Sequence, residues 1–337
     1  MDSILQLKPI GFHWELYDPF IFCAHHNDHF PRGNEQQGPD PRLLDGRNIG
    51  NDFVVKDGFR MYHGSSVPGF PVHPHRGFET VTITLKGLVD HSDSLGASGR
   101  YGNGDVQWMT AGKGIQHSEM FPLLHSDREN PLELLQVWIN LPARSKFVEP
   151  YYKMLWSEDI PVIEVSNSSG KKGKLLLIAG EFNGVAALSP TPDSWAADPA
   201  HEVGIWIAEL EPGATIELPP AKGNVSRAVY YYYGDGMTIG GQEMPGKHQA
   251  RMQAGQPVQV VNGDTASTFL VLQGKPIAEP VAQYGPFVMN TRTEIQQAYQ
   301  DYTQTSFGGW PWDRQDPVHG SEPRRFAKYI DGSEEKK

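Results

Sequence analysis

The sequence predicts an all-β fold of two antiparallel β-barrels followed by one short helix. Residues 80–85 alternate polar and apolar side chains and are mostly β-branched, which is typical of a strand. The 36 glycines and 27 prolines separate runs of this kind and predict turns between strands. Further strand-like runs occupy residues 174–180, 203–210, 227–234 and 268–274. Their recurrence in the second half of the chain indicates a second barrel built like the first.

One helix is predicted near the C-terminus, over residues 294–303. Thr291 and Glu294 have the spacing of a capping box. The residues that follow place apolar side chains at helical intervals, and Phe307 with two glycines ends the pattern. Residues 310–337 are polar and contain prolines, so we expect a partly mobile C-terminal extension.

Composition excludes several classes of protein. The formal net charge of −11 disfavours direct binding to nucleic acid, which requires a positive surface. No run approaches 18 apolar residues, so no membrane-spanning segment is expected. Cys23 is the single cysteine, so an intrachain disulfide is excluded and a reducing compartment fits. The first residues lack the basic and apolar regions of a signal peptide. We therefore expect a cytoplasmic protein.

Two pairs of metal-binding residue types lie about 40 residues apart. His73 and His75 form the first pair, and His117 and Glu119 form the second. Side chains at positions i and i+2 of a strand point to the same face, so each pair would enter one cavity. The pairs and the strand between them favour a mononuclear metal site inside a small barrel. The spacing of the first pair alone equally fits a proline-rich turn with two solvated histidines.

Longer motifs surround both pairs. Residues 69–82 read GFPVHPHRGFETVT, residues 90–96 read DHSDSLG, and residues 104–120 read GDVQWMTAGKGIQHSEM. These motifs resemble the pirin family of the cupin superfamily. Weaker similarity to the same family covers residues 136–142, 148–152, 283–291 and 294–299.

The resemblance implies a bicupin fold of two jelly-roll barrels with one iron in the N-terminal barrel. It implies that His73, His75, His117 and Glu119 are the metal ligands. We accordingly expect a metal-binding domain at residues 1–150, a metal-free domain at 151–309 and the extension at 310–337. Manganese, nickel or zinc are alternatives to iron, because nitrogen and oxygen ligands also suit these ions.

Glu79 is a second candidate for the carboxylate ligand. Many cupins take their carboxylate from this position, and Glu79 lies an even number of residues from His75. The pirin pattern favours Glu119 instead. For Glu79 the alternative is an ion pair with a nearby arginine such as Arg76.

Other polar clusters have less specific interpretations. Residues 25–29, with His26 and Asp28 on one face, predict either a second metal site or a hydrogen-bonded loop near the main cavity. His91 and Asp93 predict either outer support for the metal site or an exposed barrel rim. Residues 31–52 predict a long surface loop, with a lid or an oligomer contact as alternatives. In the second half, His201 and His248 lack the paired spacing, so that barrel is expected to be metal-free.

Three functions fit a site of three imidazoles and one carboxylate. The first is a dioxygenase that opens the heterocycle of a flavonol such as quercetin, an activity that the pirin resemblance implies. In it, Glu119 is the candidate general base. The second is a non-enzymatic, redox-responsive regulator in which iron controls binding to a transcription factor or a metabolic enzyme. The third is another cupin activity, such as isomerisation of a small polar molecule. We favour the dioxygenase, with a flavonol and dioxygen as substrates.

Overall fold

The computed structural model describes residues 3–11 and 14–337, and its described strand pairings are antiparallel. The predicted all-β bicupin class with one short α-helix is confirmed. Contacts divide the chain into two compact units, and neither is continuous in sequence. Unit 1 comprises Met1–Cys23, Trp138–Pro142 and Glu158–Ala278, and unit 2 comprises Ala24–Val137, Ala143–Ser157 and Glu279–Lys337. The domain boundaries expected at residues 150 and 309 stay a prediction.

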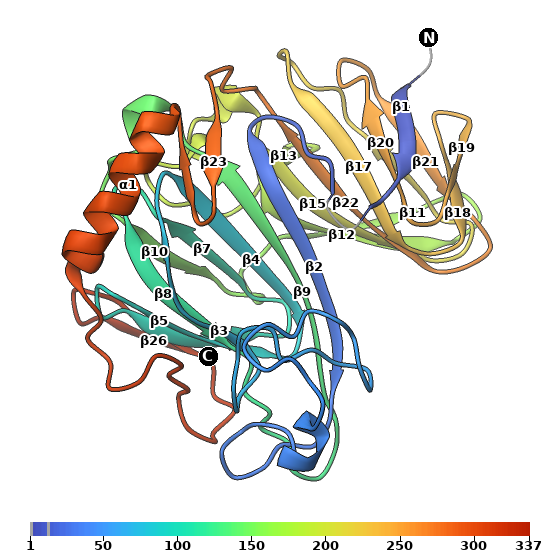
Figure 1. Ribbon diagram of the computed structural model, residues 1–337. Helices are drawn as coiled ribbons and strands as arrows, with labels where there is room; N and C mark the ends of the chain where they lie inside the picture. Colours follow the sequence, from blue (N-terminus) through green and yellow to red (C-terminus); the bar gives the residue numbers. More distant parts are fainter. Residues whose placement is uncertain (1–2, 12–13) are drawn as a thin grey trace. The chain divides into compact units, whose positions relative to one another are not determined.

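Unit 2 is built around a five-stranded and a six-stranded sheet (Figure 1). The five-stranded sheet has the order β10 (Tyr151–Leu155), β7 (Val106–Thr110), β4 (Phe78–Lys86), β9 (Asn130–Asn140) and β2 (Phe20–Phe30). The six-stranded sheet has the order β26 (Glu334–Lys336), β25 (Phe326–Lys328), β6 (Ser98–Gly102), β5 (Leu88–Asp93), β8 (Ile115–Met120) and β3 (Gly69–His75). The unit also contains β23 (Ala282–Tyr284), β24 (Phe287–Met289) and the 3₁₀ turns η1 (Pro41–Leu44), η2 (Ala143–Ser145) and η5 (Ser306–Gly308). The division between the units falls within β2 and β9.

Unit 1 repeats this two-sheet architecture. The larger sheet has the order β1 (Ile4–Pro9), β20 (His248–Met252), β17 (Ser226–Tyr233), β22 (Ser267–Gly274), β15 (Gly204–Leu210), β12 (Lys172–Ala179) and β11 (Val162–Ser166). The smaller sheet has the order β16 (Thr215–Leu218), β21 (Val258–Asn262), β18 (Gly236–Ile239) and β19 (Gln242–Pro245). The remaining elements are β13 (Glu181–Phe182), β14 (Val185–Ala186), η3 (Trp195–Ala197) and η4 (Pro199–His201).

The interiors of the two units differ in polarity. In unit 1, apolar and aromatic side chains such as Trp206, Tyr231 and Phe269 are buried in one cluster with residues of the smaller sheet. In unit 2, β4 buries a row of hydroxyls from Thr80, Thr82 and Thr84. Because alternate residues of a strand share a face, these hydroxyls point to one side of the five-stranded sheet. Unit 2 therefore buries a polar strand face in addition to its own apolar cluster.

The predicted helix is confirmed and slightly longer than expected. Helix α1 spans Arg292–Thr305, and Thr291 and Glu294 form the predicted capping box. Its buried residues Ile295 and Ala298 pack with Phe287 and Phe307. The described helices include none that is long and apolar enough to cross a membrane.

The C-terminal segment adds β25 and β26 to the six-stranded sheet of unit 2, and its expected partial mobility stays a prediction. β25 pairs with β6, and the Asp90 carboxylate accepts hydrogen bonds from the Arg100 side chain at 2.6 and 2.7 Å. Arg100 also donates to the carbonyl groups of Gly320 and Glu322. The physical reason is that a fully buried ion pair requires further polar partners, which this segment supplies.

We predict that Asp90→Asn lowers the free energy of unfolding by about 3–5 kcal/mol, because it leaves the Arg100 cation buried without a counter-charge. The measurement is chemical denaturation followed by circular dichroism. Asp127→Asn is the matched control, since Asp127 and Arg128 form a highly exposed pair worth less than about 1 kcal/mol. Equal losses in the two variants would show that the buried pair does not hold this region together.

Candidate metal centre

The pairing of β3 with β8 brings the two predicted ligand pairs together. In their antiparallel register, His73 lies opposite His117. Side chains opposite each other in such a ladder share a face, so both histidines enter the space between the two sheets of unit 2. His75 follows on the same face of β3 by strand alternation. The sequence-based placement of the three histidines is therefore what the structure shows.

The three imidazoles form a compact group. The ring centroids lie 4.8 Å apart for His73 and His75, 4.4 Å for His73 and His117, and 4.9 Å for His75 and His117. One ring nitrogen of each residue lies within 4.8 Å of the corresponding nitrogen of the other two. His75 and His117 are buried, whereas His73 is partly exposed. These histidines can hold one metal ion.

The hydrogen bonds and charge states of the rings also fit a metal ion. Nδ1 of His73 lies 2.9 Å from the carbonyl oxygen of Pro71, so this nitrogen donates and Nε2 keeps its lone pair. Neither ring nitrogen of His117 has a hydrogen-bond partner among the described residues, which is costly for a buried polar group. Burial lowers the pKa of His73 to about 4 and lowers the pKa values of His75 and His117 below the usual range. Neutral imidazoles are the form that binds metals.

Glu119 lies beside this group and is held by neutral donors. Its Oε2 is 3.7 Å from Nε2 of His117. Nε2 of Gln136 donates to both carboxylate oxygens at 3.0 and 2.9 Å, and the Thr82 hydroxyl donates to Oε1 at 3.2 Å. Burial raises the pKa of Glu119, while hydrogen bonds from Gln136 and Thr82 oppose that rise. The role of Glu119 as a ligand stays a prediction.

Glu79 occupies a different environment from the one expected. The Arg76 side chain donates to Asp301 at 2.7 Å, so the suggested Arg76 partner is wrong for Glu79. The fully buried Glu79 carboxylate instead accepts hydrogen bonds from Trp108 and Thr110 at 3.3 and 2.7 Å. The even spacing between His75 and Glu79 does not place their side chains on one face. The reason is that the chain turns between β3 and β4, at Gly77, whose φ is 85°. Within β4, Glu79 and Thr82 face opposite sides, and Thr82 is the residue that contacts Glu119.

His91 and Asp93 lie inside unit 2, so the alternative of an exposed rim is wrong. Both side chains are buried, and they lie 3.3 Å apart. The His91 ring stacks on Tyr152 with a centroid distance of 4.8 Å and lies 5.6 Å from the His117 ring. β5 pairs with β8 so that His91 is opposite Glu119 and Asp93 is opposite His117. His91 and Asp93 therefore lie beside β8, on the face that carries His117 and Glu119. This position fits the predicted outer support of the metal site.

The cluster at residues 25–29 belongs to β2 and forms a hydrogen-bond chain with Tyr62. Nδ1 of His26 lies 2.8 Å from the Tyr62 hydroxyl, which donates to Asp28 at 2.5 Å. Arg60 pairs with the same carboxylate at 2.9 Å. His25 contacts Glu133 at 3.3 Å. The described residues contain no group of metal-binding side chains here, so the hydrogen-bonded alternative fits better than a second metal site.

His201 and His248 of unit 1 have ordinary structural contacts. His201 stacks on Trp195 with a centroid distance of 3.4 Å, and its Nδ1 lies 2.8 Å from the Trp195 carbonyl oxygen. Nδ1 of His248 lies 2.9 Å from the carbonyl oxygen of Gly246. These contacts explain both residues without a metal ion.

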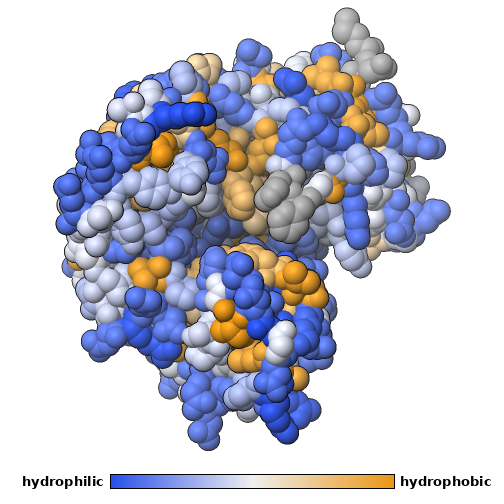
Figure 2. Space-filling view, viewed as in Figure 1, coloured by the Kyte–Doolittle hydropathy of each residue, from blue (hydrophilic) through white to orange (hydrophobic). Residues whose placement is uncertain are grey.

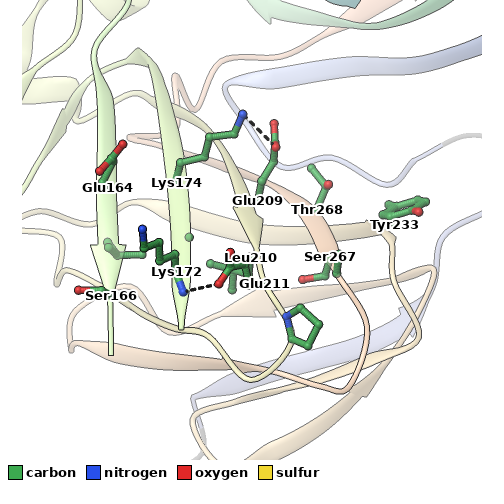
Figure 3. A pocket seen from close by; sticks show the side chains of 14 residues that line it. Glu164, Ser166, Lys172, Lys174, Glu209, Leu210, Glu211, Tyr233, Ser267 and Thr268 are labelled. Atoms are coloured by element: carbon green, nitrogen blue, oxygen red, sulfur yellow. Dashed lines mark hydrogen bonds and ion pairs between the residues drawn. The ribbon is translucent and has the colours of Figure 1, made fainter. Parts of the chain in front are cut away.

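Unit 1 contains a cavity of about 770 Å³ that lies apart from the three histidines in sequence and lining (Figure 3). Its lining includes a cross-strand row in which Glu164 is opposite Lys174 and Lys174 is opposite Glu209. Lys174 and Glu209 form an ion pair at 3.1 Å. The row thus carries charges of both signs, and the lining does not indicate one class of ligand.

Sequence analysis missed three residues next to the candidate centre. Gln136 and Thr82 hold Glu119, and Tyr152 stacks on His91. Thr82 lies in the alternating run of β4, and Gln136 and Tyr152 lie in motifs that resemble pirins. Their contacts depend on how separate strands of unit 2 face each other, which spacing within one strand does not predict.

Comparisons with known proteins identify relatives over most of the chain. A family model described as Pirin matches residues 40–139, and a model described as Pirin C-terminal cupin domain matches residues 205–308. Human Pirin is 39% identical over 258 residues, which are 74% of this chain and 81% of the human protein. A Pirin-like protein of Solanum lycopersicum is 38% identical over 270 residues, 78% of this chain and 84% of that protein. The crystal structure of quercetin 2,3-dioxygenase from Acinetobacter baumannii matches with a TM-score of 0.68 and 28% identity, over 91% of this chain and 96% of that chain.

We predict that the purified protein binds about one metal ion per chain and that the double variant His73→Ala, His117→Ala binds almost none. Removing two of the three imidazoles removes most of the donor set, so the affinity falls steeply. Elemental analysis after loading with iron(II) measures the effect. The double variant His201→Ala, His248→Ala is the matched control and should retain the metal. Full occupancy in the first variant would contradict the assignment.

A second prediction concerns pH and the metal-free protein. The folded-state pKa of His73 is lowered to about 4, so between pH 6.5 and 4 the unfolded chain binds a proton there that the folded chain does not. The free energy of unfolding should therefore fall as the pH falls through this range, with His73 contributing about 1–3 kcal/mol. The measurement is denaturation of the parent protein and of His73→Gln at several pH values. The difference between their pH slopes gives the contribution of His73 to the free energy of unfolding. Identical pH slopes would show that His73 is not buried in its neutral form.

Proposed function

Because the chain belongs to the pirin family, we propose that it is a mononuclear iron dioxygenase that opens the heterocycle of a flavonol such as quercetin. The observation that carries this proposal is the group of three neutral imidazoles beside a buried carboxylate. The name of the related Acinetobacter baumannii structure, quercetin 2,3-dioxygenase, supports the same reaction class.

The donor set suits a metal that takes part in a reaction. The three described imidazoles leave coordination positions available, whereas structural zinc sites are closed by four protein ligands that often include thiolates. Cys23 is buried on β2 and lies outside the group. An iron(II) ion held by His73, His75 and His117 would supply a Lewis acid for the substrate oxygens and electrons for dioxygen.

Glu119 has the position and the surroundings of a general base. Its carboxylate lies beside His117, so a substrate hydroxyl that reaches the imidazoles also reaches Glu119. Gln136 donates to both of its oxygens and fixes the orientation of the carboxylate. The buried setting raises the pKa of Glu119, which strengthens it as a proton acceptor in its ionised form. In this proposal Glu119 removes the proton from the 3-hydroxyl of the flavonol and holds it at a carboxylate oxygen.

Glutamine at position 119 separates proton transfer from metal binding. We predict that Glu119→Gln keeps the fold and much of the iron but lowers flavonol turnover by about 10²–10⁴-fold, because an amide cannot accept the proton. The measurement is the decay of flavonol absorbance together with dioxygen uptake, each expressed per bound iron.

Glu149→Gln is the matched control, since it makes the same chemical change at a highly exposed carboxylate that pairs with Lys113. It should turn over at the parent rate. Equal rates for Glu119→Gln and the parent would exclude Glu119 as the base. No flavonol decay in the iron-loaded parent would contradict the dioxygenase and favour the regulator, whose binding to a protein partner would depend on the oxidation state of iron.

A further inference from the structure

A surface segment of unit 2 places aromatic side chains next to the partly exposed ligand His73. Phe53 and His63 belong to the long segment between β2 and β3, and Phe70 lies on β3. Ring centroids lie 5.0 Å apart for Phe53 and His63, 6.3 Å for Phe53 and Phe70, and 5.8 Å for His63 and Phe70. The Phe70 ring lies 6.3 Å from the His73 ring. The three rings form a continuous group, here named the aromatic wall, that reaches the candidate metal centre.

A β-bulge explains why Phe70 reaches the side of His73. Residues three apart on a regular strand point to opposite faces. The register of β3 with β8 shifts between Phe70 and His73, so that Phe70 is opposite Glu119 while His73 is opposite His117. A bulge of this kind redirects a side chain, and such bulges are frequent beside active sites. The strand that supplies two histidines therefore also supplies the inner member of the wall.

The outer members of the wall belong to a segment with a fixed internal structure. Asp52 and Tyr62 pair by backbone hydrogen bonds, and Arg47 donates to Asp52 at 2.9 Å with its guanidinium 3.8 Å from the Phe59 ring centroid. Nδ1 of His63 lies 2.7 Å from the carbonyl oxygen of Gly50, which orients this ring. A long irregular segment with this many internal contacts is typical of a functional loop. The wall is thus preformed.

The outer members of the wall are open to solvent. Phe53 is 37% exposed and His63 is exposed, whereas Tyr62 behind them is fully buried. Of the three histidines at the candidate metal centre, His73 is the least buried residue. Figure 2 shows hydrophobic surface where Figure 1 draws the segment after β2, and the exposed apolar residues there include Val54 and Val55. Among them, Phe53 is the residue whose ring contacts Phe70 and so connects the surface to the metal centre.

We propose that Phe53, His63 and Phe70 bind a planar aromatic ring of the substrate while its hydroxy-ketone oxygens lie at the metal centre. This proposal rests on the proposed function and adds to it the residues that bind the part of the substrate beyond the hydroxy-ketone. Aromatic rings pack edge-to-face or offset against one another at centroid distances of about 4.5–7 Å, the range already present within the wall. A substrate with fused or pendant rings gains these contacts, and a single-ring analogue does not.

The test compares two probes on the iron(II)-loaded protein without dioxygen. Quercetin carries the hydroxy-ketone with additional rings, whereas maltol, a single-ring hydroxypyranone, carries the hydroxy-ketone alone. Spectroscopic titration gives a Kd for each probe with the parent, Phe53→Ala and the control Val54→Ala, whose side chain is 77% exposed in the same segment. We expect Phe53→Ala to weaken quercetin binding about three- to tenfold and to leave maltol binding unchanged. Phe53→Tyr keeps an aromatic ring at this position, so it should bind quercetin as the parent does. Val54→Ala should also behave as the parent.

The outcomes separate the wall from the metal centre. Unchanged quercetin binding in Phe53→Ala overturns the proposed role of the wall. An equal loss of binding for quercetin and maltol also overturns it, because such a loss would reflect a disturbed His73. A parent protein that binds maltol and quercetin equally well also overturns the wall but leaves the metal-centred function intact. A parent protein that binds neither probe overturns the proposed function and the wall together.

Discussion

The candidate metal centre depends on the register between β3 and β8. His73 opposite His117 fixes two imidazoles on one face, and strand alternation adds His75 and Glu119. A shift of one residue in this pairing would turn the ligand side chains of one strand away from those of the other. Several contacts hold the outer face of β8: Gln116 donates to the carbonyl groups of Ser306 and Gly309 and accepts from the Tyr302 hydroxyl. Helix α1 and the turn that follows it therefore stabilise the strand that carries His117.

The polar side chains buried in unit 2 have an energetic cost that a bound metal ion would offset. Neutral buried imidazoles without hydrogen bonds, such as His117, are unfavourable in a folded protein. Coordination would satisfy their lone pairs, and binding to the folded state alone would stabilise that state. In unit 1 the space between the sheets is filled by apolar side chains such as Trp206 and Phe269, which need no such partner. The two similar barrels thus differ in the residues that face inward.

Much of this arrangement could be predicted from the sequence, and the limits have physical reasons. Alternation within one strand correctly placed His73 with His75, and the capping box correctly placed the start of α1. The same alternation failed for Glu79, because the turn at Gly77 interrupts the strand. Gln136 and the aromatic wall were not predicted, since they reach the site through pairing between strands and through a β-bulge. Local periodicity carries no information about these contacts.

The central claim is that unit 2 holds one catalytic iron between His73, His75 and His117. Crystals of the iron-loaded protein, measured with X-rays at the iron absorption edge, test this claim most directly through the anomalous difference map. We predict one strong peak at about 2.0–2.3 Å from a ring nitrogen of each of the three histidines. A fully loaded protein with its strongest peak elsewhere, for example beside Glu164 and Glu209 in the cavity of unit 1, would contradict it.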